Sequence, residues 1–204
     1  MEVHCASMGN QAGPRPLNDL DFIAESFSSV PESLADEFLF RHVHPDDPPG
    51  KTMVQFVDSE TSLRVDVFRA YGAEMQRAVP FLFGNQTISL VCIEDLTARL
   101  GRLALGVASG GPTPLTYARD FLRLANCVGD AKVEPVWPEH RKPDHPKTYA
   151  EARSMLEELI GTRQDLLTTR NYSKDIAAIC PRCKPCSRLR CADPKVILEI
   201  LGYC

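Results

Sequence analysis

The chain has 204 residues, of which 44% are hydrophobic and 25% charged, and its formal net charge is −4. These values are typical of a soluble globular protein, and the negative charge provides no general attraction to nucleic acid or anionic membranes. No stretch approaches the roughly 18 apolar residues of a membrane span, and the N-terminus lacks the basic start and apolar core of a secretory signal. We therefore expect a cytoplasmic protein that has no membrane partner.

The first half of the sequence predicts a small mixed α/β core. Residues 1–17 indicate a short helix and a loop, residues 18–24 a buried strand, and residues 30–38 a helix. Alternating apolar residues, interrupted by turn residues, then predict further strands, of which the second and third form an antiparallel hairpin. These strands are expected over residues 38–45, 51–58, 62–70, 81–83 and 87–91.

After residue 92 apolar residues recur every three or four positions, which predicts helices. Helices are expected over residues 94–109, 116–128 and 148–162, with a Pro-rich connector over 133–146. The sequence thus predicts an α/β (α+β) protein in three parts. These are a mixed-sheet core over residues 1–92, a helical region over 93–170 and a Cys-rich tail over 171–204.

Three aspartates lie in apolar, strand-like stretches, where Asp is normally depleted. Asp19 and Asp21 belong to RPLNDLDFIA, and Asp66 belongs to SLRVDVFRA. Residues two apart in a strand share a face, so Asp19 and Asp21 are expected to project together. With Asp66 on a nearby strand, they would form an oxygen-only site for Mg²⁺. An acidic strand end carrying surface charges is the alternative interpretation.

The order of these parts resembles the nucleotidyltransferase fold of the polymerase-β superfamily, and in particular the bacterial toxin-type nucleotidyltransferases of abortive-infection systems. The resemblance covers roughly residues 15–125 and rests on the DLDF strand, the hairpin carrying RVDVFRA and the helices that begin at ISLVCIEDL. It implies that Asp19, Asp21 and Asp66 are catalytic, hold Mg²⁺ and position a nucleoside triphosphate such as ATP. The nucleotidyl group would pass to a hydroxyl of an unidentified acceptor, either a protein or a nucleic acid.

The family also places a Gly-Ser or Gly-Gly pair at a helix start before the D-x-D motif, where backbone N–H groups meet the triphosphate. The comparable place in this sequence holds Gly9-Asn10, close to Asp19. We therefore expect a chain that begins inside this helix. It would be either an N-terminally truncated enzyme or a degenerate, catalytically inactive relative that acts as a binding module.

Several arginines lie near the three aspartates in the sequence. Arg15 precedes the Asp pair and Arg64 shares the strand face of Asp66, so both are candidates for binding phosphate, whereas Arg69 is expected to point away. Solvated surface charges are the alternative interpretation. The resemblance also implies helper residues on the first two helices, and the comparable positions are Arg99, Arg102 and Asp120.

Two pairs of histidines were considered as metal ligands. His42 and His44 lie two apart in RHVHP, a spacing that suits Zn²⁺ or Mn²⁺ on a strand face. Because the sequence offers no third ligand, we expect solvent-facing side chains on an edge strand instead. The same expectation applies to His140 and His145 in the Pro-rich connector.

The last 25 residues contain five of the eight cysteines, four of them in the pattern C-x₂-C-x₂-C-x₄-C. Four of the five are predicted to hold a structural Zn²⁺, because the thiolates of a C-x₂-C turn can face one ion. The ligands would be either the first four cysteines, or the first two with the last and one of the other two. In chain order the five are Cys180, Cys183, Cys186, Cys191 and Cys204.

The Cys-rich tail has other interpretations as well. An iron–sulfur cluster and a set of unligated thiols both remain alternatives. The basic run RCKPCSRLR also suggests a second function class, a zinc-dependent module that binds nucleic acid or protein. The remaining cysteines, Cys5, Cys92 and Cys127, are expected to be ordinary buried residues.

Overall fold

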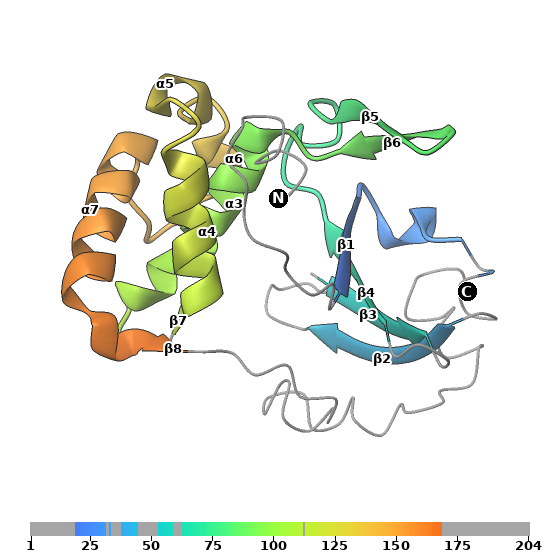
Figure 1. Cartoon of the computed structure of the whole chain (residues 1–204), viewed down its shortest axis with the longest axis horizontal. Coiled ribbons are helices and arrows are strands. Elements are labelled where there is room, and N and C mark those ends of the chain that lie inside the picture. Colours follow the sequence, from blue (N-terminus) through green and yellow to red (C-terminus); the bar gives the residue numbers. More distant parts are fainter. Residues whose placement is uncertain are drawn as a thin grey trace. The chain divides into compact units, whose positions relative to one another are not determined.

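The structure is a computed structural model, and it falls into two compact units that are described separately below (Figure 1). The described parts of the chain are residues 19–31, 33, 38–44, 53–58, 63–111 and 113–168. The first unit, within residues 19–70, is built on a mixed sheet, and the second, within 71–168, is mostly helical. The fold is therefore mixed α/β. The expected helix and loop over 1–17, most of the expected helix over 30–38 and the tail over 171–204 lie outside the described residues.

Within the described residues, the first unit contains a sheet of four strands in the order β1-β4-β3-β2. Strand β1 runs parallel to β4, and the other neighbouring strands are antiparallel. The strands follow the ranges that the alternating pattern predicted, including the β3–β4 hairpin. Their bounds are Asp19–Ala24 (β1), Phe38–His44 (β2), Met53–Asp58 (β3) and Arg64–Arg69 (β4), and a 3₁₀ turn, η1, covers Phe27–Ser29.

One face of this sheet is apolar. Val54 and Phe56 of β3 are fully buried and lie beside two valines of β4, Val67 and Val65 respectively. Leu20 and Phe22 of β1 belong to the same face by the β1–β4 register, because paired residues share a face. The opposite face carries the polar residues described below.

Strand β1 is more exposed than the sequence indicated. Leu20 is 36% exposed and Phe22 is 53% exposed, so the expectation of a buried strand over 18–24 is wrong. The reason is the position of β1 in the sheet: among the described strands it pairs on one side only, with β4. An apolar segment at the edge of a sheet still forms a strand, but no neighbouring strand covers its outer side.

The second unit begins after Ala70 and contains a hairpin followed by helices. The hairpin belongs to this unit, whereas the sequence indicated a boundary at residue 92. Its strands are β5, Val79–Phe83, and β6, Gln86–Leu90, which pair antiparallel. The helices are α3 (Ile93–Ala104), α4 (Leu115–Ala125), α5 (Asp130–Val133), α6 (Trp137–His140) and α7 (Tyr149–Thr162). Shorter elements are η2 (Leu105–Val107), η3 (Gln164–Leu166) and two parallel strands, β7 (Thr113–Pro114) and β8 (Leu167–Thr168).

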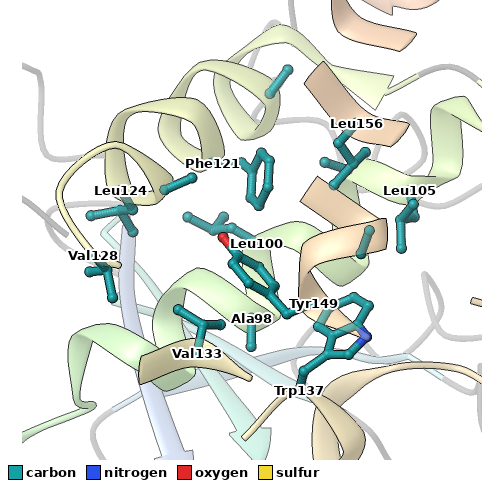
Figure 2. Close-up of a cluster of buried hydrophobic side chains, with 14 of the residues drawn as sticks. Ala98, Leu100, Leu105, Phe121, Leu124, Val128, Val133, Trp137, Tyr149 and Leu156 are labelled. Carbon is teal, nitrogen blue, oxygen red and sulfur yellow. The ribbon is translucent and has the colours of Figure 1, made fainter. Parts of the chain in front are cut away.

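Helices α3, α4 and α7 enclose the apolar core of the second unit, into which α6 also packs (Figure 2). Trp137, Tyr149 and Phe121 are fully buried, and Tyr149 meets both other rings edge-on. The indole N–H of Trp137 donates to the carbonyl oxygen of Pro146 at 3.0 Å. This segment therefore contributes Val133, Val136 and Trp137 to the core, which corrects the expectation of a simple Pro-rich connector over residues 133–146.

Helix α7 shows how the sequence determines a helix boundary. Its N-cap, Thr148, accepts a hydrogen bond from the backbone N–H of Glu151, and the Glu151 carboxylate accepts one from the N–H of Thr148. This reciprocal pair satisfies two donors that a helix start otherwise leaves free. The helix predicted to begin near Thr148 is confirmed.

A buried polar network joins α3 to α6 and to the turn before the hairpin. The carboxylate of Asp95 is fully buried and lies 2.7 Å from Nε2 of His140, while Arg77 donates to both of its oxygens at 2.7 and 2.8 Å. Cys92 completes the set, with its thiol 3.0 Å from Asp95. The prediction of a solvent-facing His140 is wrong, because α6 turns its ring onto Asp95.

The same network depends on a glycine in the turn. Arg77 also pairs with Glu139, which in addition accepts a hydrogen bond from the N–H of Ala73 at 2.9 Å. Gly72 has a φ of +50°, and a Cβ added there would lie 2.2 Å from Glu139 Oε2. Both the backbone angle and the close carboxylate therefore require glycine at this position.

Three further side chains of the second unit differ in how far they are buried. His145 is half-buried and its ring stacks on Trp137, so it is not simply solvent-facing. Cys92 is buried as expected, whereas Cys127 is only half-buried, and both side chains are reduced thiols. None of the helices in the described part of the chain has the length and apolar composition needed to cross a membrane.

Candidate metal centre

The polar face of the first unit is assembled by strand register. In the parallel β1–β4 pair, Asp19 lies beside Arg64 and Asp21 lies beside Asp66. In the antiparallel β3–β4 pair, Gln55 lies beside Asp66. All five side chains therefore belong to one face, because paired residues point to the same side of a sheet. The expectation that Asp19 and Asp21 share a face with the third aspartate is confirmed.

The three carboxylates meet closely enough to share a cation. One oxygen from each of Asp19, Asp21 and Asp66 can be chosen so that all lie within 4.8 Å of one another. Oxygens on opposite sides of one Mg²⁺ lie about 4 Å apart, since Mg–O distances are about 2.0–2.1 Å. Small side-chain adjustments would thus bring the three oxygens onto one ion. An all-oxygen donor set suits Mg²⁺ or Mn²⁺ and does not suit softer metals.

The three aspartates differ in their access to water. Asp66 is 4% exposed and forms the floor of the cluster, Asp19 is intermediate, and Asp21 is exposed. Partial burial of its carboxylate, together with the negative charges of Asp19 and Asp66, raises the pKa of Asp21 to about 6, although the positive charge of Arg64 acts in the opposite direction. The negative charge of the three carboxylates therefore exceeds the positive charge that nearby side chains supply. Such an excess favours the binding of a divalent cation.

Arg64 already supplies one positive charge to this cluster. Its Nη2 donates a hydrogen bond to Asp19 Oδ2, and its Nε lies 3.2 Å from Asp66 Oδ2. Arg64 shares the strand face of Asp66, as predicted, and Arg69 is exposed, as expected. A cation therefore occupies the space between two of the three carboxylates. Arg64 therefore balances part of the negative charge of the cluster.

Gln55 also belongs to this site, although its sequence position did not predict it. This side chain is 1% exposed, and its Nε2 donates to Asp66 Oδ1 at 2.6 Å. A signal was present in MVQFVD, where a polar residue interrupts an apolar strand opposite the RVDVFR strand. Turning that signal into a contact required the register of the hairpin, which the sequence pattern alone did not determine.

The other residues predicted to belong to the site are not found at the aspartate cluster among the described residues. Arg15 and the five tail cysteines lie outside the described residues. Nothing is described of the side chains of His42 and His44, which belong to β2, the outer strand at the other end of the described sheet. The helper candidates belong to the second unit, and the two arginines are engaged within it. Arg99 pairs with the buried Glu74 at 2.6 Å, and Arg102 donates to the hydroxyl of Tyr71.

Comparison with known proteins does not identify the chain. No protein-family model, curated protein sequence or solved structure matches it. The functional argument therefore depends on the chain's own residues. Its strongest element is the acidic cluster on the polar face of the β1–β4–β3 sheet.

Proposed function

We propose that this protein is a nucleotidyltransferase of the polymerase-β type. It would transfer a nucleotidyl group from a magnesium-bound nucleoside triphosphate, such as ATP, to a hydroxyl group on a protein or nucleic acid. The observation that carries the proposal is the convergence of Asp19, Asp21 and Asp66 on one face of the sheet, with oxygens within 4.8 Å of one another. The D-x-D pair on one strand and the third aspartate on its neighbour match the arrangement that the sequence resemblance implies.

The residues of the cluster have distinct roles in this proposal. Asp19 and Asp21 hold Mg²⁺ from β1, and Asp66 completes the site from β4. Bound Mg²⁺ supplies the positive charge that stabilises the reacting phosphate group. The acceptor hydroxyl gives up its proton to a carboxylate of the cluster, its oxygen bonds to the α-phosphorus, and pyrophosphate leaves. Asp21 is the exposed member and therefore faces the incoming substrate.

Arg64 has a second role once a metal neutralises the carboxylates. Its guanidinium carries several N–H donors in a plane that matches phosphate oxygens. Released from Asp19, it would lie beside the metal and contact the triphosphate. A cytosolic location belongs to the same proposal, since the cytosol supplies nucleoside triphosphates and keeps thiols such as Cys92 and Cys127 reduced.

Nucleotide incorporation tests this function. The full chain is incubated with Mg²⁺, each of the four α-³²P-labelled nucleoside triphosphates, and cell RNA or protein as acceptor. We expect label in one acceptor fraction, and its loss in Asp21→Asn and Asp66→Asn. Glu25→Gln, which removes an exposed carboxylate next to β1, is the matched control and should retain incorporation. Equal incorporation by the wild type and both Asp variants rules out the assignment.

A second candidate, an inactive relative that acts as a binding module, is favoured by one observation. The ion pairs of Arg64 with Asp19 and Asp66 neutralise part of the cluster without any metal. In an inactive relative these pairs would serve only to stabilise the sheet. The two candidates differ in a metal titration, because the enzyme binds Mg²⁺ or Mn²⁺ at the three aspartates and the inactive relative does not.

A further inference from the structure

We propose that Gln55 is a positioning residue for the metal centre. Its amide N–H group holds one oxygen of Asp66, so that the other oxygen is presented toward Asp19. This inference rests on the proposed metal site and concerns a residue to which the sequence resemblance assigns no role. It is carried by a buried contact between two strands of the hairpin.

The contact between Gln55 and Asp66 is short and buried. Gln55 is the direct partner of Asp66 across the β3–β4 pair, and its Nε2 lies 2.6 Å from Asp66 Oδ1. Gln55 is 1% exposed and Asp66 is 4% exposed, so water does not compete freely for this bond. A hydrogen bond to an ionised acceptor is also stronger than one between neutral groups.

The two oxygens of Asp66 therefore have different surroundings. Oδ1 is held by Gln55, whereas Oδ2 lies 3.2 Å from Nε of Arg64, the residue that also contacts Asp19. A carboxylate group rotates over a broad range about its terminal bond unless its oxygens are held. Gln55 thus selects Oδ2 as the oxygen that a cation shared with Asp19 can reach.

The chemistry of the amide suits this task. An amide donates a hydrogen bond without adding charge, so it orients the carboxylate without repelling a metal as a second arginine would. Mutation of residues that orient metal ligands in this way typically lowers metal affinity or activity by about 10–100-fold. The amide also has a cost, since Gln55 Oε1 is buried and has no hydrogen-bond partner among the described residues. An apolar side chain of similar size would avoid that cost, which indicates that the donor at this position is needed.

Mn²⁺ titration by calorimetry on the full chain tests this role. Gln55→Met keeps the size of the side chain and removes the donor, and we expect it to weaken Mn²⁺ binding about tenfold. Phe56→Leu is the matched control, because Phe56 is fully buried on the same strand but belongs to the opposite face of the sheet. It should lower the melting temperature while leaving Mn²⁺ affinity unchanged. In an Asp66→Ala background, Gln55→Met should have no further effect on Mn²⁺ affinity.

The outcomes separate this inference from the proposed function. If the wild type binds Mn²⁺ at the aspartates and Gln55→Met binds it equally well, the role of Gln55 is overturned and the metal site stands. If Phe56→Leu weakens binding as much as Gln55→Met does, the effect is a general loss of sheet stability, and the role is again overturned. If the wild type does not bind Mn²⁺ at all, the proposed function and this inference fail together.

Discussion

The guanidinium of Arg64 lies against the carboxylate of Asp66, two residues further along the same strand, with 3.2 Å between Nε and Oδ2. Through Nη2 the same side chain reaches Asp19 on the neighbouring strand. In the proposed metal site, a metal ion and this guanidinium would therefore compete for the same oxygens. The guanidinium thus offsets part of the repulsion among the three carboxylates.

This competition predicts the direction of a mutational effect. We expect Arg64→Gln to raise Mn²⁺ affinity by roughly three- to tenfold, or about 1 kcal/mol, because removing the cation frees two carboxylates and ends its repulsion of the metal. Arg64→Lys keeps the charge and should change affinity much less. Calorimetric titration measures both. Weaker binding by Arg64→Gln would instead mean that Arg64 builds the site and does not compete with the metal.

The crowding of the aspartates also predicts a pH dependence of stability. In the metal-free protein the pKa of Asp21 is raised from 3.8 to about 6, so the folded state holds this proton more tightly than the unfolded chain does. Ionisation of Asp21 therefore lowers stability as the pH rises from about 4 to about 6, and the loss persists above that range. We expect Asp21→Asn to melt a few degrees higher than the wild type at pH 7.5 in EDTA, and no higher at pH 4. Equal melting temperatures at pH 7.5 would show that the charges are not crowded.

The buried network of the second unit predicts a larger loss of stability. Burial alone raises the pKa of Asp95, but the hydrogen bonds from His140 and Arg77 outweigh it and hold the pKa well below its usual range. Asp95→Asn leaves the guanidinium of Arg77 and the buried ring of His140 without their charged partner, and we expect it to reduce the free energy of unfolding by about 3 kcal/mol at pH 7. Urea denaturation measures this loss.

The loss of stability caused by Asp95→Asn should become smaller as the pH falls. Because the folded-state pKa of Asp95 is depressed, its contribution is present above the ordinary value of 3.8 and disappears as the pH falls through the folded-state pKa. The difference between the wild type and Asp95→Asn should therefore shrink in acid. Glu94→Gln, which changes the neighbouring residue of α3, is the control and should have a small effect. A loss below about 1 kcal/mol for Asp95→Asn would contradict the role of this network.

The tail cysteines provide a prediction that rests on sequence alone. Four of the five cysteines between Cys180 and Cys204 are predicted to hold one Zn²⁺. Metal analysis of purified protein should find about one zinc per chain, and Cys180→Ser combined with Cys183→Ser should remove it. Iron in place of zinc would indicate a cluster, and neither metal above background would indicate free thiols.

The sequence predicted the positions of strands and helices better than it predicted the burial and contacts of their side chains. The alternation around Asp19 and Asp66 was sufficient to place both strands and the shared face, because a period of two follows directly from strand geometry. It did not show that β1 lies at the edge of the described sheet, since an apolar run looks the same at the edge and in the centre of a sheet. The Asp95–His140 contact was missed because its partners are 45 residues apart. Gln55 was missed for the related reason that strand register was needed to bring it to Asp66.

Metal binding at the three aspartates tests the central claim most directly. Mn²⁺ is titrated calorimetrically into the full chain, into Asp21→Asn and Asp66→Asn, and into Glu25→Gln as the control. The hard Mn²⁺ ion selects oxygen ligands over the thiols of the tail. We predict saturable binding by the wild type and Glu25→Gln, with strongly reduced affinity in both Asp variants. No binding by the wild type, or equal binding by all four proteins, would contradict the assignment of this cluster as a metal centre.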